Sequence, residues 1–344
     1  MKLLVTGGAG FIGSHFVRKW LAHHPSDEVV TLDLLTYAGV QATIQELTEH
    51  PRHRFVQGDI CDSDAVQQTM QGCQTVVHFA AETHVDRSIT NAARFVRTNV
   101  EGTQTLLHWA RELGIQRFVH ISTDEVYGPI LEGAYAESAQ LNPRSPYAAS
   151  KAAGDLLVRA YQETYGLPAI IVRPTNAFGP RQFPEKFIPL CITNALEDRP
   201  LPLYGDGLYR RDWLYVEDLC RAIERVAEAG ELGAIYNVGS LWEMTNLKVA
   251  EMVLQLVGKP RSFIEFVTDR PGHDRRYAMD STKLSQLGWH PRVAFEDGLR
   301  ETVAWYGEHL DWWRSLKARL RNDSYHWLYQ SPDPDAGQAV GAAA

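Results

Sequence analysis

The sequence has few cysteines, no long apolar run and no excess of basic residues. Its cysteines, at Cys61, Cys73, Cys191 and Cys220, lack the Cys-x-x-Cys spacing of metal and redox sites, so we expect unpaired structural thiols and no metal. Apolar runs reach only strand length, far short of the roughly 18 residues of a membrane helix. With 42 acidic against 34 basic residues, the chain offers no surplus positive charge to a phosphate backbone. We therefore expect no membrane and no nucleic-acid partner.

The residues after Met1 begin a strand pattern and show no apolar segment typical of a secretory signal peptide. Together with scattered thiols, this predicts a cytoplasmic protein. The chain has 344 residues, of which 44% are hydrophobic, and this length is enough for two domains.

The first half of the chain alternates short β-branched runs with amphipathic segments. Strands separated by helices connect through right-handed crossovers into a parallel sheet. We therefore expect the α/β class: a Rossmann-type doubly wound parallel sheet, with a smaller C-terminal α/β substrate lobe over its carboxyl edge. The expected strands are 2–6, 29–33, 54–57, 75–79, 117–122 and 169–173, and the expected helices are 11–22, 147–165, 184–196, 217–229, 246–257 and 295–312.

Proline and glycine cluster after Pro174, and this change divides the chain. We assign residues 1–174 to the sheet domain, 175–330 to the lobe and 331–344 to a frayed tail. The boundary is soft, because later segments can return to the first domain.

A glycine-rich turn follows the first strand and opens the first helix. Gly7, Gly10 and Gly13 allow a tight turn, so that the helix N-terminus, with Phe11 and Ile12, can face a pyrophosphate. Such a string alone also fits a plain tight turn. Asp33, however, lies 20 residues after Gly13 at the end of the second strand, where a carboxylate accepts ribose hydroxyls and repels a 2′-phosphate. The first domain is therefore predicted to bind NAD rather than NADP.

Two further strand ends border the expected cofactor. Asp59 and Ile60 follow the third strand, beside the adenine, whereas Asp62 is better placed to cap the next helix. The small residues at the end of the fourth strand allow the cofactor to lie against the backbone; they are Phe79-Ala80-Ala81.

Tyr147 and Lys151 are the strongest local signal. Residues four apart lie on one helical face, about 6 Å apart along the axis. The ammonium is expected to lower the pKa of the phenol, so that the phenolate can take a proton from a substrate hydroxyl as hydride leaves the carbon. The pair also occurs by chance on many helices. Ser122 and Thr123 end the fifth strand within reach of the same oxygen, and the combination is typical of extended short-chain dehydrogenases.

Asp124 and Glu125 come next and are adjacent carboxylates. They could simply cap a helix or stand in a solvated loop. Two acids with separated pKa values can instead act as general acid and general base. An epimerase needs neither, whereas elimination of water needs both.

The string 122–128, with the Tyr147/Lys151 pair, resembles the nucleotide-sugar 4,6-dehydratases, and among them the dTDP-glucose 4,6-dehydratases. The resemblance runs from Met1 to about Leu316 and includes the strings 35–39, 81–88, 182–186, 211–218 and 269–276. It implies a lyase that uses NAD to convert a nucleoside-diphosphate glucose, best dTDP-glucose, into the 4-keto-6-deoxy sugar, with Glu125 removing the C5 proton and Asp124 protonating the C6 hydroxyl. Dehydration of UDP-glucose or UDP-N-acetylglucosamine, 4-epimerisation and non-catalytic dinucleotide sensing are the alternatives.

The resemblance also implies further site residues and an assembly. Leu34, Leu35, Thr36, Thr83 and Thr98 would join the cofactor site. A homodimer would form through a four-helix bundle of helices 94–113 and 147–165. Their outer faces offer Leu106, Trp109 and Leu157 as candidates, although a monomer could bury these side chains against its own sheet. Ala177 departs from the family, which has a cofactor-binding Asn there. The nucleotide sugar would contact Thr83, Thr123, Asp124, Glu125, Asn176, Glu185, Lys186, Pro202, Leu203, Tyr204, Arg211, Asn246, Arg270 and His273.

Overall fold

The computed structural model describes residues 1–322, so the predicted tail and the last residues of the predicted lobe lie outside the described residues. Its strands are β1 (Lys2–Thr6), β2 (Glu28–Asp33), β3 (His53–Gln57), β4 (Thr75–His78), β5 (Arg117–Ile121), β6 (Ala169–Pro174), β7 (Asn176–Phe178), β8 (Leu201–Tyr204), β9 (Arg210–Tyr215), β10 (Ile235–Val238), β11 (Glu243–Thr245) and β12 (Ile264–Val267).

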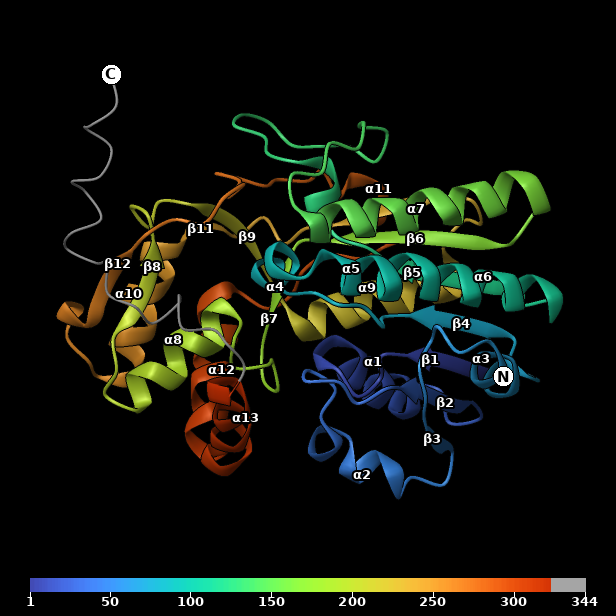
Figure 1. Ribbon diagram of the computed structural model, residues 1–344, viewed down its shortest axis with the longest axis horizontal. Coiled ribbons are helices and arrows are strands. Elements are labelled where there is room, and N and C mark those ends of the chain that lie inside the picture. Colours follow the sequence, from blue (N-terminus) through green and yellow to red (C-terminus); the bar gives the residue numbers. More distant parts are fainter. Residues whose placement is uncertain (323–344) are drawn as a thin grey trace.

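Seven of these strands form one parallel sheet in the order β10-β6-β5-β4-β1-β2-β3 (Figure 1). The chain builds outward from β1 to β3 and then starts again on the other side of β1 with β4. This reversal opens a crevice at the carboxyl ends of β1 and β4, the place where doubly wound sheets bind ligands. The predicted α/β class and Rossmann-type sheet are confirmed.

The helices are α1 (Phe11–His23), α2 (Gln45–Thr48), α3 (Ser63–Met70), α4 (Val85–Thr90), α5 (Ala92–Val96), α6 (Thr103–Glu112), α7 (Pro146–Tyr165), α8 (Phe187–Leu196), α9 (Val216–Ala229), α10 (Asn246–Val257), α11 (Thr282–Ser285), α12 (Phe295–Glu308) and α13 (Leu310–Asn322). Short 3₁₀ turns cover Gln41–Thr43, Asp124–Tyr127 and Arg261–Phe263, and a π-helical turn covers Arg97–Gly102.

Alternating side chains of β1 face two apolar cores. Leu3 and Val5 pack with α1 and α9 on one face of the sheet, and Leu4 packs with α3, α6 and α7 on the other. Because both faces are covered, the sheet is held rigidly, and its carboxyl edge is a fixed frame for a site.

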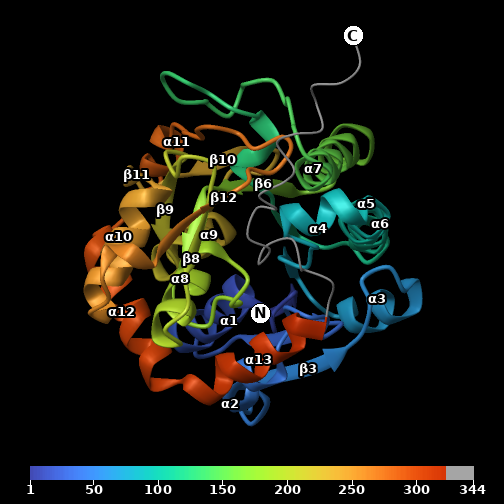
Figure 2. The same ribbon diagram turned by 60° about the vertical axis from the view of Figure 1, so that its left-hand side comes forward.

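A smaller lobe stands at that carboxyl edge (Figures 1 and 2). It contains the sheets β11-β9-β7 and β12-β8, and its core includes Trp213, Val253 and Leu299. The chain then returns: β10, which comes after the predicted boundary at residue 174, pairs with β6 in the large sheet.

Two predictions about helices are wrong. The helix expected over 295–312 is broken at His309, because the indole N–H of Trp313 takes the Tyr306 carbonyl (2.8 Å) that a continuous helix would use. Leu106 does not face outward, since it is fully buried in the subunit core. Within residues 1–322, no helix combines the length and apolar character needed to cross a membrane.

Candidate active site

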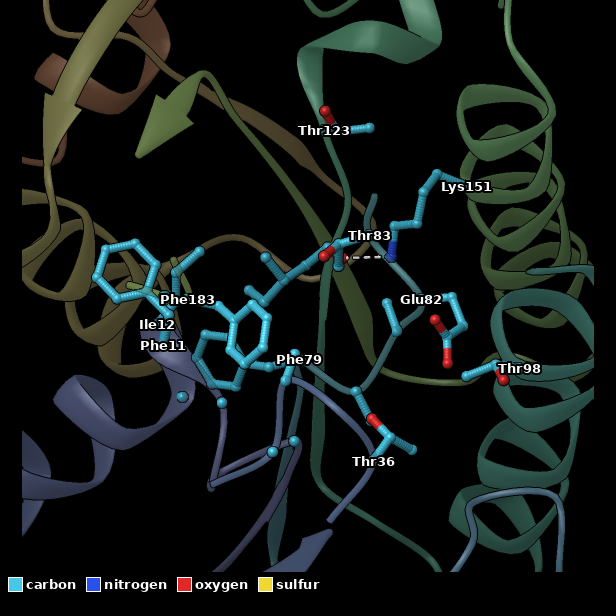
Figure 3. A pocket seen from close by; sticks show the side chains of 18 of the residues that line it. Phe11, Ile12, Thr36, Phe79, Glu82, Thr83, Thr98, Thr123, Lys151 and Phe183 are labelled. Carbon is cyan, nitrogen blue, oxygen red and sulfur yellow. Dashed lines mark hydrogen bonds between the residues drawn. The ribbon is translucent and has the colours of Figure 1, made fainter. Parts of the chain in front are cut away.

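A cavity of about 570 Å³ lies at the carboxyl ends of the central strands (Figure 3). Figure 3 shows Phe79, Glu82 and Thr83 facing the cavity. Thr98 comes from the π-helical turn Arg97–Gly102, and Lys151 comes from helix α7. The residues predicted to bind the cofactor that line it are Gly7, Gly10, Phe11, Ile12, Gly13, Asp33, Leu34, Thr36, Asp59, Ile60, Phe79, Ala80, Ala81, Thr83, Thr98, Ser122, Tyr147 and Lys151.

The glycine-rich turn leaves room for a ligand against the backbone. Gly7 has a φ of +74°, and a Cβ there would lie 2.5 Å from the Ala80 nitrogen, so only glycine fits. Gly10 precedes α1, and no side chain caps this helix end. Its backbone N–H groups are therefore available to an anion, as a pyrophosphate requires.

Asp33 is fixed at the end of β2 by two backbone donors. Its carboxylate accepts hydrogen bonds from Ala9 N–H and Leu35 N–H, both at 2.9 Å. Burial raises the pKa of Asp33, and these two hydrogen bonds act in the opposite direction. Leu35 contributes only its backbone N–H to this site. Its φ is +56° and its side chain packs against the core. Contrary to the prediction, Leu35 does not line the cavity.

Asp59 lies at another border of the cavity. It accepts from Cys61 N–H at 2.9 Å and pairs with Arg97 at 3.3 Å. Asp62 caps α3 through the amides of Asp64 and Ala65, as predicted, and the place of Asp59 beside the adenine stays a prediction.

Lys151 and Tyr147 both line the cavity from α7. Burial lowers the pKa of the Lys151 ammonium to about 8, with Asp155 opposing the shift. The pKa of Tyr147 is raised, first by burial and then by the negative charge of Glu125, against a hydrogen bond with Thr123. The expectation that Lys151 would leave the phenol with a lowered pKa is therefore wrong for the chain's own groups.

Asp124 and Glu125 enter the same cavity from a 3₁₀ turn. Asp124 is 3% exposed, and its carboxylate contacts the hydroxyls of Thr123 (3.1 Å) and Thr175 (3.2 Å). Burial and the charge of Glu125 raise the pKa of Asp124 to about 7. This turn is capped by Thr123, not by either acid, so the capping explanation for the pair does not hold.

Three cations keep Glu125 closer to its ionised form. Burial raises the pKa of Glu125, while Arg270, Arg211 and Lys186 act to lower it, in that order. Asp124 is thus favoured in its protonated form, as a general acid. Glu125 is surrounded by positive charges that favour its ionised form, as a general base.

The residues predicted to hold the nucleotide sugar fall into two sets. Thr83, Thr123, Asp124, Glu125, Asn176 and Lys186 line the cavity. Glu185, Pro202, Leu203, Tyr204, Arg211, Asn246, Arg270 and His273 do not, although Arg211 and Arg270 lie close enough to act on Glu125.

Two of these residues have other partners. Leu203 is 1% exposed and its side chain packs within the lobe core, so only its backbone could contact a ligand, and the contact of segment 202–204 with the base stays a prediction. Glu185 turns its carboxylate to Arg87 at 3.1 Å instead of into the cavity.

Several lining residues were not predicted. The sequence could have indicated Arg94, because it lies one helical turn before Thr98, and Glu82 and Phe183, because they stand inside the family-like strings. Thr175 carries no local signal, since only tertiary packing brings it to Asp124. The polar and aromatic members of this set are Glu82, Arg94, Arg97, Thr175, Gln182 and Phe183.

Known proteins resemble the chain over almost its full length. A family model described as GDP-mannose 4,6 dehydratase matches residues 4–302. A dTDP-glucose 4,6-dehydratase of Streptomyces niveus is 51% identical, covering 92% of this chain and 96% of the relative. The low-salt glycan biosynthesis protein Agl12 of Haloferax volcanii is 53% identical over 89% of this chain and 98% of the relative.

Solved structures agree with the sequence comparison. The dTDP-glucose 4,6-dehydratase DesIV of Streptomyces venezuelae, solved with NAD bound, superposes with a TM-score of 0.91 at 51% identity, covering 92% of this chain and all of that one. The chain therefore belongs to the nucleotide-sugar dehydratase family described as GDP-mannose 4,6 dehydratase, and its similar relatives there include dTDP-glucose 4,6-dehydratases.

Proposed function

We propose that the protein is an NAD-dependent dTDP-glucose 4,6-dehydratase. The observation that carries the proposal is that Asp124 and Glu125 share one cavity with Tyr147 and Lys151, and that Asp124 has a pKa raised to about 7. A group that holds a proton near neutral pH, beside a second carboxylate, fits elimination of water.

The cavity fits a dinucleotide from its own residues. The bare turn at Gly7 and Gly10 would hold the pyrophosphate, and Asp33 would accept from the adenosine ribose. When bound, NAD supplies the acceptor for the C4 hydride and the donor that reduces C6. Tyr147 would take the proton of the C4 hydroxyl as its phenolate, and the positive charges of Lys151 and of the oxidised nicotinamide would favour that form against burial and Glu125.

The carboxylates then remove water across C5 and C6. The C4 ketone acidifies the C5 proton, and Glu125 accepts it. Asp124 gives its proton to the C6 hydroxyl, which leaves as water. The proposed product is the 4-keto-6-deoxy sugar, one water lighter than the substrate.

One assay tests both the reaction and the substrate. The protein is incubated separately with dTDP-glucose, UDP-glucose, UDP-N-acetylglucosamine and GDP-mannose, and the products are weighed by mass spectrometry. We expect loss of one water from dTDP-glucose first. Preferential dehydration of another sugar nucleotide would correct the substrate, and isomerisation without mass loss would replace the dehydratase by a 4-epimerase.

We also propose a cytoplasmic homodimer. The four cysteines are free thiols, as suits a reducing compartment. Helix α5 exposes Val96 (54%) and helix α7 exposes Leu156 (56%), and we propose that a four-helix bundle covers both side chains. Light scattering at micromolar concentration should give twice the mass of the chain, and Leu156→Glu should lower it; a single-chain mass for the parent protein would refute the dimer.

A further inference from the structure

A buried carboxylate stands among the groups that were predicted to hold the nucleotide. Asp86, on α4 of the first domain, is 5% exposed. Its Oδ1 accepts from Arg270 Nη1 at 2.9 Å, and its Oδ2 accepts from Tyr204 OH at 3.3 Å. Both partners belong to the lobe, so one carboxylate connects two lobe residues to the first domain.

Arg270 is only partly satisfied by this contact. Its Nε is buried and has no hydrogen-bond partner among the described residues. A guanidinium with one edge held by a carboxylate and a buried donor to spare is arranged to receive another anion. The same Arg270 is the foremost charge that lowers the pKa of Glu125, so its position matters both to the nucleotide and to the proposed base.

Tyr204 carries the arrangement further into the lobe. Its ring meets the His273 ring edge-on at 5.7 Å, and His273 stacks on Tyr209 at 3.7 Å. Burial and the charge of Arg270 lower the pKa of His273 to about 3, so this imidazole is neutral. Tyr204 and His273 therefore pack together, and Asp86 links Tyr204 to Arg270 through its two carboxylate oxygens.

A carboxylate here would repel a diphosphate if it acted through its charge alone. Its two hydrogen bonds give it a different use. We propose that Asp86 is a positioning residue, which fixes Arg270 and Tyr204 so that they meet the diphosphate of the nucleotide sugar. This inference rests on the proposed function, because it takes a nucleoside diphosphate as the ligand.

The sign of one measurement separates the two effects. Asp86→Asn removes a negative charge, so charge alone predicts tighter binding of dTDP. Loss of positioning predicts weaker binding, by about tenfold or more, because Arg270 loses its charge-assisted partner. Titration calorimetry of the NAD-loaded enzyme measures the Kd of dTDP, and of UDP in parallel, for the parent and for Asp86→Asn.

Three further variants test whether a change in dTDP binding comes from the positioning role of Asp86. Asp297→Asn removes a carboxylate from an exposed pair with Arg300 (2.7 Å) and should leave binding unchanged. Arg270→Gln should weaken dTDP binding, and adding Asp86→Asn to it should weaken binding by a smaller factor than Asp86→Asn does in the parent, since residues acting as a unit are not additive. Asp86→Glu keeps the charge and should bind dTDP better than Asp86→Asn.

The kinetics give a second readout. In Asp86→Asn, KM for the sugar nucleotide should rise with the Kd of dTDP, while kcat changes less; a general loss of structure would lower kcat and the Tm together. Unchanged or tighter dTDP binding by Asp86→Asn, additive effects with Arg270→Gln, or a parent enzyme that binds neither diphosphate would overturn the inference. If the parent binds dTDP but does not dehydrate dTDP-glucose, the proposed function fails while the test of Asp86 stands.

Discussion

The Lys151 ammonium donates a 2.7 Å hydrogen bond to the carbonyl of Ile121, the last residue of β5. Helix α7 is thereby tied to the sheet directly before Ser122 and Thr123. The bond holds the Tyr147/Lys151 pair next to the strand end that leads into Asp124 and Glu125, so the groups proposed for oxidation and for elimination are joined through one hydrogen bond.

Glu125→Gln should separate these two stages. The amide keeps size and hydrogen bonding but cannot accept the C5 proton, and general base catalysis is typically worth about 10²- to 10⁴-fold. The variant should still reduce bound NAD when given substrate and then stall. Its reduced-nicotinamide absorbance should persist, and deuterium uptake at C5 should nearly vanish.

Tyr147→Phe is the matched control for that experiment, because it removes the hydroxyl needed for oxidation and should abolish the absorbance change. A Glu125→Gln enzyme that turns over at the parental rate would remove Glu125 from the mechanism.

The pH profile should be bell-shaped. Asp124 must be protonated to act as the acid, and its pKa is raised to about 7, so kcat/KM should fall as pH rises through that region. Glu125 must be ionised, and burial raises its pKa, so activity should fall on the acid side above the range of an ordinary glutamate. Since the two carboxyls interact, the limbs belong to the pair. Asp124→Asn should lower kcat by about 10²- to 10⁴-fold, and the fall of kcat/KM at alkaline pH should disappear. If the alkaline fall is unchanged in this variant, it belongs to another group.

Asp33 should set the choice of cofactor. A 2′-phosphate would approach a carboxylate held by Ala9 and Leu35, and such like-charge contacts cost several kcal/mol. We expect cofactor-stripped protein to bind NAD about 100-fold or more tightly than NADP. Asp33→Asn should bring the affinities for NAD and NADP closer together. Equal affinities of the parent protein for NAD and NADP would refute the role of Asp33 in cofactor choice.

Ala177 should weaken the hold on the cofactor. It lines the cavity at a position where the sequence resemblance implies a cofactor-binding Asn, and its methyl group cannot donate or accept a hydrogen bond. Ala177→Asn should therefore retain more NAD through gel filtration than the parent. Ala177→Leu matches the size of the Asn side chain without its amide and should retain no more NAD than the parent. If Ala177→Asn and Ala177→Leu retain NAD equally, the amide has no role in holding the cofactor.

The sequence predicts those parts of the site that depend on short spacing. Gly7, Asp33, Tyr147 and Lys151 are set by one turn, one strand or one helix, and all line the cavity. The pairs Asp86–Arg270 and Arg87–Glu185 are 184 and 98 residues apart, so no local pattern shows them. The direction of the Tyr147 pKa was missed for a related reason, because burial and Glu125 act on it only in the folded chain.

The return of β10 has a consequence for how the chain is made. During synthesis, β6 waits as an open strand edge while residues 175–234 are added, which takes roughly 3 to 12 s at about 5–20 residues per second. All its residues are buried in the finished sheet, and an apolar open edge of this kind pairs readily with other chains. A ribosome-bound chain therefore keeps this edge unpaired until β10 has emerged, and a fragment ending at residue 174 would keep it open permanently.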